Sequence, residues 1–370
     1  MSALSASDAL HARVRAFARS GGASEAFADL ALAIARFQAE HVPGFARLVA
    51  LDGSTLDTVA SIPAVPTDAF RLTRVAAHPP ELDTVRFETS GTTASERGVH
   101  VMRTTETYAE LALLGGEAAL LAGRSRTIVA LAPEPAEPPT SSLGFMMRLF
   151  MERFDGRALS GGSFEPAERG RWLASTAGID VDGLRRAARI AADRGEPLLL
   201  LATSFALSAL LDALAGDTIP LPEGSVVMQT GGFKGRTREI PKAELRSAVA
   251  RAFAVPEAAV VAEYGMTELS SQLYEGTVPG VRRAGPPDVL LEPPWLSVVP
   301  VDPETLAPVP DGEVGLARCV DLGNVDSAIA ILTRDRVRRR HGGIELLGRA
   351  PGAPPRGCSL ALEALLEARP

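Results

Sequence analysis

Three short segments of the sequence combine hydroxyl, glycine and charged residues directly after an apolar run. The first contains Thr89, Ser90, Gly91, Thr92 and Thr93 and follows the run TVRFE. A strand that leads into such a loop offers backbone N–H groups and hydroxyls that can surround a phosphate. The loop lacks the lysine and the spacing of a Walker motif. Its composition is also that of an ordinary Ser/Thr turn, so this segment alone is a weak signal.

The second segment contains Tyr264, Gly265, Met266, Thr267 and Glu268 and follows the run AVVAE. It puts an aromatic ring, a glycine, a hydroxyl and a carboxylate at the carboxyl end of a predicted strand, where open α/β sheets bind ligands. The carboxylate suits Mg²⁺, which prefers oxygen ligands and shares them with substrate phosphates. The alternative is a helix N-terminus with Thr267 as its cap and Glu268 in its first turn.

The third segment contains Thr230, Gly231, Gly232, Phe233 and Lys234 and follows the run SVVMQ. Its two glycines allow the backbone to approach a flat ligand closely, and the phenylalanine can offer such a ligand an aromatic face. A plain strand-to-loop turn is the alternative. Only two of the 38 basic residues are lysines, so a mechanism that needs a lysine has few candidates.

Alternating strand and helix patterns predict how these segments are positioned. Helices are expected within residues 1–60, where apolar residues recur every three or four positions. From residue 84, short apolar runs alternate with helical segments, which is typical of βαβ units and of a mostly parallel sheet covered by helices. In such a sheet the three segments would meet at one edge, because each follows a strand.

The expected elements have the following bounds. Strands are predicted at 84–88, 127–132, 198–202, 225–230, 259–264 and 329–335, with a hairpin around 302–315. Helices are predicted at 108–122, 141–154, 242–253 and directly after residue 202, where Thr203 or Ser204 would cap the helix.

Composition excludes several classes of protein. The chain has 370 residues, is 46% hydrophobic and carries a net charge of −7, with no basic block. It can therefore build a sizeable core, and a nucleic-acid or anionic-membrane partner is disfavoured. The two cysteines cannot form a disulfide framework, and no signal peptide is recognisable, so we expect a soluble protein of the reducing cytoplasm.

The five histidines show no metal-ligand spacing, so no metal site beyond Mg²⁺ is suggested. His100 follows the first segment closely. It could face a ligand there, although a lone histidine more often has a structural role.

The order of the motifs resembles a known superfamily. TSGTT, TGGFKGR, YGMTEL, ILTRD and LGR look like the motif series of the adenylate-forming acyl-CoA synthetases, luciferases and related ligases. RFETSGTT, TGGFKGR, YGMTELSSQLY and PRGCSL resemble more closely the acyl-protein synthetase family, which includes the fatty-acid ligase of bacterial bioluminescence. The resemblance runs from about residue 85 to 362. It implies the α/β fold of an adenylate-forming N-terminal (AMP-binding) domain, with parallel sheets covered by helices, over residues 1–345.

The resemblance also assigns residues to ATP. The residues expected to hold its β- and γ-phosphates are Thr89, Ser90, Gly91, Thr92 and Thr93. Those expected to line the adenine and acyl pocket, or to lie by the adenine, are Gly231, Gly232, Phe233, Tyr264, Gly265 and Met266. Thr267 would contact the α-phosphate, Glu268 would hold Mg²⁺, Asp335 would take the ribose hydroxyls, and Arg349 matches the arginine at the hinge.

The implied reaction joins a fatty or aryl carboxylic acid to AMP and then transfers the acyl group to a thiol. Larger members carry a C-terminal lid domain with a lysine that contacts the activated carboxylate. Here residues 346–370 are expected to be only a truncated hinge and tail, so either Lys234 replaces that lysine or the reaction proceeds without it. Ala94 also stands where a glycine commonly follows TSGTT.

Cys358 in PRGCSL matches the family's acyl-accepting cysteine. It would take the acyl group as a thioester and present it to a reductase or another protein partner. The alternatives are transfer to coenzyme A, a carrier protein or an amine, with Cys358 as an incidental residue. A non-catalytic module of the same fold that binds a nucleotide or a partner is a third possibility. Cys319, in an apolar run, is expected to be a packing residue.

Overall fold

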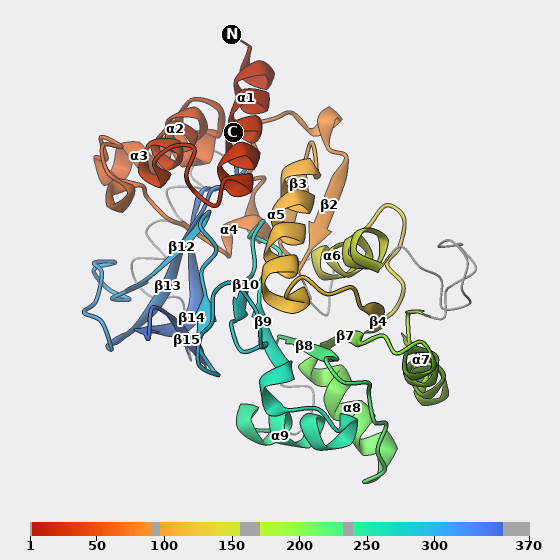
Figure 1. The fold of residues 1–370 in the computed structure, drawn as a ribbon. Coiled ribbons are helices and arrows are strands. Elements are labelled where there is room, and N and C mark those ends of the chain that lie inside the picture. Colours follow the sequence, from red (N-terminus) through yellow and green to blue (C-terminus); the bar gives the residue numbers. More distant parts are fainter. Residues whose placement is uncertain (1, 90–96, 156–170, 232–239, 351–370) are drawn as a thin grey trace.

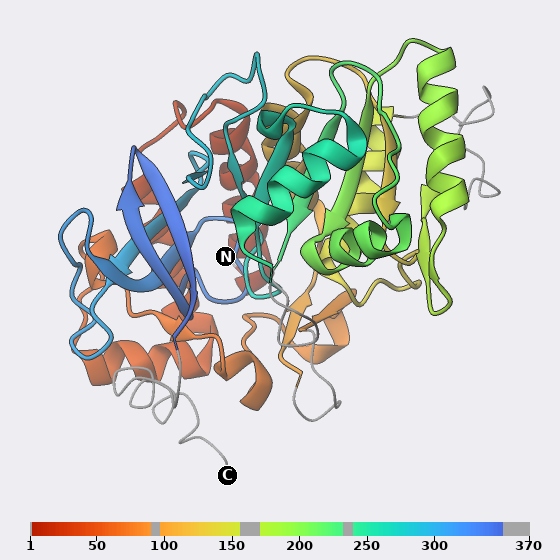
Figure 2. The same ribbon diagram turned by 90° about the horizontal axis from the view of Figure 1, so that it is seen from below.

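The computed structural model describes residues 2–89, 97–155, 171–231 and 240–350. Several predicted site residues lie outside these ranges: Ser90, Gly91, Thr92, Thr93, Gly232, Phe233, Lys234 and Cys358. The described parts form an α/β structure around one large mixed sheet, which Figure 1 shows from one side and Figure 2 from below.

One half of the sheet is parallel and carries the predicted strand–helix alternation. Its strands lie side by side in the order β9 (Val260–Tyr264), β8 (Val226–Thr230), β7 (Leu198–Thr203) and β4 (Thr127–Leu131). All neighbouring pairs among them are parallel. The sequences of these strands are continuous apolar runs, because helices cover both faces of this part of the sheet. The predicted α/β fold class is confirmed by this half.

Helices cover both faces of the parallel strands (Figure 1). Three helices pack on one face: α7 (Val181–Asp193), α8 (Ser204–Leu214) and α9 (Lys242–Phe253). On the other face lie α5 (Glu106–Gly116) and α6 (Ser142–Phe150), which continue as the π-helical segments Glu117–Leu121 and Met151–Asp155. The Thr203 side chain caps α8 by accepting a hydrogen bond from the Ala206 N–H at 3.1 Å, as predicted.

The other half of the sheet is antiparallel and was predicted only in part. Beyond β9 the order is β10 (Leu273–Glu275), β11 (Leu290–Leu291), β15 (Gly343–Arg349), β14 (Ala330–Arg340), β13 (Val314–Asp321) and β12 (Leu296–Val301). The hairpin around 302–315 is confirmed as the connection of β12 to β13. Strand β15 crosses residue 345, so the division there, which stays a prediction, would fall inside a strand.

The N-terminal helices pack against this antiparallel half. They are α1 (Ala3–Arg19), α2 (Phe27–His41) and α3 (Pro43–Asp52). Buried residues such as Leu30, Ile34 and Phe45 share a core with Ile331 and with Cys319, which is fully buried. The expectation that Cys319 is a packing residue is therefore confirmed.

Short elements follow these helices: Val59–Ser61 (3-10), β1 (Val65–Pro66), α4 (Ala69–Leu72) and Pro80–Leu82 (3-10). Strand β1 pairs in parallel with β14. A separate two-stranded sheet joins β5 (Ala174–Ser175) and β6 (Gly178–Ile179). Among the described residues, no helix has both the length and the apolar character needed to span a bilayer.

One expected strand of the parallel sheet lies elsewhere. The run 84–88 forms β2 (Val85–Glu88), which pairs antiparallel with β3 (Val99–Met102) in a sheet of their own. The prediction that this run belongs to the parallel sheet is wrong. A short run with alternating exposure can pair with any neighbouring edge, and here its nearest partner is the strand that follows it in sequence.

Candidate active site

Three strands bring Tyr264, Asp335 and Arg349 together, although the three residues lie far apart in the sequence. The Tyr264 hydroxyl at the end of β9 donates a hydrogen bond of 2.8 Å to the Asp335 carboxylate on β14. Arg349 on β15 stands opposite Asp335 in the register, with its Nε 3.3 Å from the other carboxylate oxygen. Burial, and then the charge of Asp335, raise the pKa of the Tyr264 hydroxyl, so it stays a hydrogen-bond donor.

The residues after Tyr264 form a turn rather than the start of a helix. Gly265 and Met266 lead into a turn at Thr267 and Glu268, and the next regular element is β10. The alternative of a helix cap at Thr267 is therefore wrong. Glu268 is 8% exposed, and its carbonyl accepts a hydrogen bond of 2.9 Å from the side-chain amide of Asn324.

This turn contacts the two-stranded sheet formed by β2 and β3. The Thr267 hydroxyl lies 3.4 Å from the carbonyl of Glu88, the last residue of β2. Thr89 follows at once and pairs with Gly98: the Thr89 N–H donates to the Gly98 carbonyl at 2.9 Å, and the Gly98 N–H to the Thr89 hydroxyl at 2.8 Å. The described base of the first segment therefore lies beside the second segment, although β2 is not in the main sheet.

His100 on β3 holds the same turn. It is 2% exposed, and its Nδ1 lies 2.8 Å from the Thr267 carbonyl, while its ring meets Phe70 edge-on at 5.4 Å. Burial lowers the pKa of His100 to about 4, so the ring is neutral at physiological pH and Nδ1–H is the donor. Of the two roles left open by the sequence, this geometry favours the structural one.

A buried polar network behind the turn was missed by sequence reasoning. The carboxylate of Asp321, at the end of β13, accepts hydrogen bonds from the Ser270 N–H at 2.8 Å, the Ser271 hydroxyl at 2.6 Å and the Gly323 N–H at 2.9 Å. Burial raises the pKa of Asp321 to about 6 despite these donors. The available signal was the run of polar residues, SSQ, between apolar neighbours in YGMTELSSQLY. The network fixes the turn to the antiparallel half of the sheet.

The third segment begins where β8 and α8 meet. The Ser204 hydroxyl, at the start of α8, donates to the Gly231 carbonyl at 2.6 Å. Gly231 has a φ of 71°, in the left-handed region that favours glycine. The Thr230 hydroxyl bonds to the Glu263 carboxylate, so the ends of β8 and β9 are tied together. The described start of this segment therefore lies beside the strand that carries Tyr264.

Of the two lysines, Lys242 has a structural contact. Its ammonium donates to the Leu346 carbonyl at 2.8 Å and so ties α9 to β15, and burial lowers its pKa. Lys234 lies outside the described residues.

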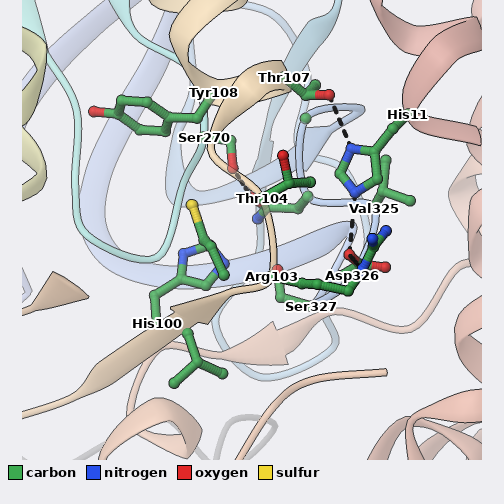
Figure 3. A pocket seen from close by; sticks show the side chains of 14 residues that line it. His11, His100, Arg103, Thr104, Thr107, Tyr108, Ser270, Val325, Asp326 and Ser327 are labelled. Carbon is green, nitrogen blue, oxygen red and sulfur yellow. Dashed lines mark hydrogen bonds and ion pairs between the residues drawn. The ribbon is translucent and has the colours of Figure 1, made fainter. Parts of the chain in front are cut away.

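A small polar pocket lies behind the turn and is separate from the predicted nucleotide residues. His11 of α1 bridges Thr107 at 2.9 Å and Asp326 at 3.1 Å across it, as Figure 3 shows. Its lining includes His100 and Arg103 but neither Tyr264 nor Glu268. Within the described ranges, no group of three or more His, Cys, Asp or Glu residues could hold a metal ion.

Comparisons with known proteins identify the fold. No family model and no curated protein matches the sequence. Among solved structures, 2-hydroxyisobutyryl-CoA ligase in complex with R3-HIB-AMP has a TM-score of 0.58 at 14% identity, covering 87% of this chain and 67% of its own. The same ligase with 2-HIB-AMP and CoA has a TM-score of 0.55 at 15% identity, covering 94% and 69%.

ATP-bound MatB from Rhodopseudomonas palustris has a TM-score of 0.46 at 17% identity. The match covers 72% of this chain and 48% of MatB, so the chain spans about half the length of that protein. At these identities the likeness extends to the fold alone. This chain has the α/β fold of the large N-terminal part of adenylate-forming enzymes.

Proposed function

We propose that this chain activates a carboxylic acid with ATP, forming an acyl-adenylate, and passes the acyl group to a thiol. The observation that carries this proposal is the Tyr264–Asp335–Arg349 contact between β9, β14 and β15, beside a turn in which Thr267 contacts Glu88, the residue before Thr89. It occurs in a fold shared with an acyl-CoA ligase whose structures contain an acid joined to AMP.

Asp335 is the proposed ribose ligand. A carboxylate can accept hydrogen bonds from the two neighbouring hydroxyls of a ribose. The contacts with Tyr264 and Arg349 orient the Asp335 carboxylate. The adenine would lie against Tyr264, Gly265 and Met266, with Gly231, Gly232 and Phe233 on the neighbouring loop. The phosphates would lie against the loop that contains Thr89, Ser90, Gly91, Thr92 and Thr93, because small residues leave their N–H groups accessible.

The donor chemistry at Glu268 fits magnesium. Its buried carboxylate and the neighbouring Thr267 hydroxyl are oxygen donors, as this hard cation prefers. Glu268 would hold Mg²⁺ jointly with phosphate oxygens of ATP, where the ion would offset the negative charge of these phosphates.

In the proposed reaction a carboxylate oxygen of the acid attacks the α-phosphorus, and the bond from this phosphorus to pyrophosphate breaks. The residues of the chain hold the reacting groups in line and donate hydrogen bonds to phosphate oxygens. Thr267 is the proposed donor to the α-phosphate, and Lys234 the proposed cation near the activated carboxylate. A thiolate then attacks the acyl carbon, the bond from this carbon to the AMP oxygen breaks, and AMP leaves.

Cys358 is the acceptor that the acyl-protein synthetase resemblance supports. A reductase or another acyl-accepting protein would then be the partner. Coenzyme A, a carrier protein or an amine is the alternative acceptor, and the ligase with the same fold binds CoA in one of its structures. A module that binds nucleotide without catalysis is the remaining candidate, and pyrophosphate release separates it from both enzymes.

Replacing Glu268 tests the catalytic assignment. Glu268→Gln should abolish acid-dependent pyrophosphate release, because the amide removes the charged ligand proposed for Mg²⁺. Glu304→Gln is the control: it makes the same chemical change at an exposed residue in the connection of β12 to β13 and should keep wild-type activity. Normal pyrophosphate release by Glu268→Gln, measured with coupled phosphate detection, contradicts the assignment.

The acceptor is tested by intact-protein mass spectrometry after incubation with Mg-ATP and a panel of fatty and aryl acids. Self-acylation should give an acyl mass increment that hydroxylamine removes and that Cys358→Ser lacks, since a thioester is labile to this nucleophile. Cys319→Ser is the control and should keep the increment, because Cys319 is fully buried. A stable increment in Cys358→Ser would show that another residue is acylated.

A further inference from the structure

Asn324 is a buried side chain that joins the turn of Thr267 and Glu268 to the loop between β13 and β14. It is 1% exposed. Its amide donates to the carbonyls of Glu268 and Ala328, at 2.9 Å in each case, and its Oδ1 accepts the Ser270 hydroxyl at 2.7 Å. Both amide hydrogens and the side-chain oxygen are therefore engaged. The backbone of Glu268 is thus held by a side chain that lies 56 positions away in the sequence.

A glycine lets this loop approach the turn closely. Gly323 donates its N–H to the Asp321 carboxylate at 2.9 Å, and the same carboxylate accepts the Ser270 N–H at 2.8 Å. A Cβ at Gly323 would lie 2.8 Å from Leu111 Cδ1 and also 2.8 Å from Ser270 Cβ. A side chain there would push the loop away from the turn, because neither distance leaves room for a carbon atom. The loop and the turn therefore form one closely packed unit.

The turn itself is held at two successive carbonyls. His100 on β3 donates to the Thr267 carbonyl at 2.8 Å, and Asn324 donates to the next one, that of Glu268. These two bonds orient the peptide groups on both sides of the Glu268 Cα. They therefore set the direction in which the Glu268 side chain leaves the backbone.

Helix α2 holds the loop that carries Asn324. Gln38 on this helix is fully buried, and its amide donates to the carbonyls of Asn324 and Val325 at 2.6 and 2.9 Å. Its Oε1 accepts the Ile329 N–H at 3.0 Å. One side chain therefore satisfies three backbone groups of this loop, and the position of Asn324 depends on α2.

We propose that Asn324 is a positioning residue of the adenylation reaction, and that α2 serves the site by holding the loop that carries it. This inference rests on the proposed function, because orienting Glu268 affects chemistry only where its carboxylate takes part. The Asn324 amide would keep this carboxylate in the direction that a shared cation and the ATP phosphates require. Groups that hold a metal ligand in place contribute about 10- to 100-fold in metal affinity or activity.

Hydrogen exchange of the ligand-free chain tests whether Asn324 orders the turn. Asn324→Ala should raise amide exchange in the peptide of residues 264–272 by about fivefold or more, because one carbonyl of the turn loses its donor. Leu184→Ala is the control: Leu184 is fully buried on α7, so its truncation should also lower the midpoint of urea unfolding. It should leave exchange in this peptide unchanged. Wild-type exchange in Asn324→Ala overturns the inference.

Cation binding tests the link to the proposed site. Mn²⁺ is titrated as a paramagnetic substitute for Mg²⁺, with a non-hydrolysable ATP analogue present, and is followed by electron paramagnetic resonance. Its dissociation constant should rise by about tenfold or more in Asn324→Ala, and the kcat of acid-dependent ATP–pyrophosphate exchange should fall. Leu184→Ala should change neither quantity. An equal effect of Leu184→Ala overturns the inference, because loss of stability would then be the cause.

Gln38→Leu gives a second, independent test. It keeps the volume of the side chain and leaves the Asn324 amide in place, but it removes three hydrogen bonds from the loop. It should shift the Mn²⁺ constant in the same direction and by less. Combined with Asn324→Ala it should add little, since Gln38 acts through Asn324. Additive effects overturn the role given to α2.

Two outcomes separate this inference from the proposed function. A Mn²⁺ constant and an exchange rate that equal the wild type in both Asn324→Ala and Gln38→Leu leave adenylation standing and overturn the inference. A wild type without acid-dependent exchange overturns the proposed function and the inference with it.

Discussion

A side-chain hydrogen bond between Tyr264 and Asp335 connects β9 directly to β14, in addition to the backbone pairing of β9 with β10. Each residue comes from a motif that the sequence could recognise, but the bond itself depends on how the antiparallel strands return toward β9. Tyr264 thus has two proposed tasks: its ring would support the adenine, and its hydroxyl orients the carboxylate for the ribose. Removing the hydroxyl separates the two tasks.

Tyr264→Phe should weaken ATP binding by about fivefold, because one hydrogen bond to the carboxylate is lost while the ring remains. Asp335→Ala should weaken it further, since the proposed ribose ligand itself is removed. The control is Tyr274→Phe, whose hydroxyl has only a 3.7 Å contact with the Met146 sulfur. Calorimetric titration with ATP checks this. An affinity unchanged in both Tyr264→Phe and Asp335→Ala would remove Asp335 from the site.

Sequence patterns located the motif residues but not the groups that support them. Tyr264 and Thr267 could be singled out because a glycine and polar residues follow an apolar run there, whereas Asp335 could be assigned only through the resemblance carried by ILTRD. Glu263 and Asp321 sit inside such runs, where a single charged residue gives no indication of its partners. Their hydrogen bonds join residues 33 and 50 positions apart, and the position of those partners is set by the fold alone.

At the scale of elements, an ion pair fixes α9 to the strands that carry the second segment. The Arg246 guanidinium on α9 donates to both oxygens of Glu275 on β10 at 3.0 and 2.6 Å, and Glu275 is fully buried. The same carboxylate accepts the Ala262 N–H of β9 at 2.9 Å. Glu275 therefore compensates a buried cation and holds the strand that ends at Tyr264.

Glu275→Gln should destabilise the protein by about 3–5 kcal/mol, because it leaves the buried Arg246 charge with only the more exposed Asp288 carboxylate, 3.4 Å away, as a counter-charge. The matched control is Glu345→Gln, which breaks the more exposed pair with Arg338 and should cost at most about 1 kcal/mol. Urea unfolding at pH 7 measures both. Equal shifts of the two unfolding midpoints would contradict this prediction, because the buried Arg246–Glu275 pair would then contribute no more to stability than the exposed pair.

Elements with strong local signals were predicted well, and those defined by their partners were not. Helix α9 has the predicted bounds, and the strands β4, β7, β8 and β9 lie within one residue of theirs, because their apolar runs are continuous and end at turn residues. The run 84–88 is a strand as predicted, but its assignment to the parallel sheet was wrong. Nothing in a run of five residues specifies which edge it joins.

At the scale of the whole molecule, the proposed site lies where the parallel and antiparallel halves of the sheet meet. The parallel half contributes the ends of β8 and β9, and the antiparallel half contributes β14 and β15. The separate ribbon β2–β3 contacts the turn after β9, because the Thr267 hydroxyl lies near the carbonyl of Glu88, the residue before Thr89. The sequence predicted that the three segments meet at one edge of a single parallel sheet. In the structure the described parts of these segments follow strands of the parallel half and of the separate β2–β3 ribbon, and the antiparallel half adds Asp335 and Arg349.

This arrangement explains why the fold could be predicted as a class but not in its layout. The βαβ alternation specifies the parallel half through local patterns. The antiparallel half contains short strands such as β11, and β14 extends into RVRRR, which has little apolar content. Its shape depends on packing against the N-terminal helices, whose core is shared with β13 and β14. Such long-range packing leaves no local pattern.

The central claim is that this chain forms an acyl-adenylate, and isotope exchange tests it most directly. The purified full chain is incubated with Mg-ATP and labelled pyrophosphate, with and without the panel of fatty and aryl acids. We predict label in ATP only when a carboxylic acid is present, and none with Glu268→Gln. Such exchange needs reversible adenylation but no thiol acceptor. ATP binding without acid-dependent exchange, in the wild type and across the panel, would contradict the claim and favour a nucleotide-binding module.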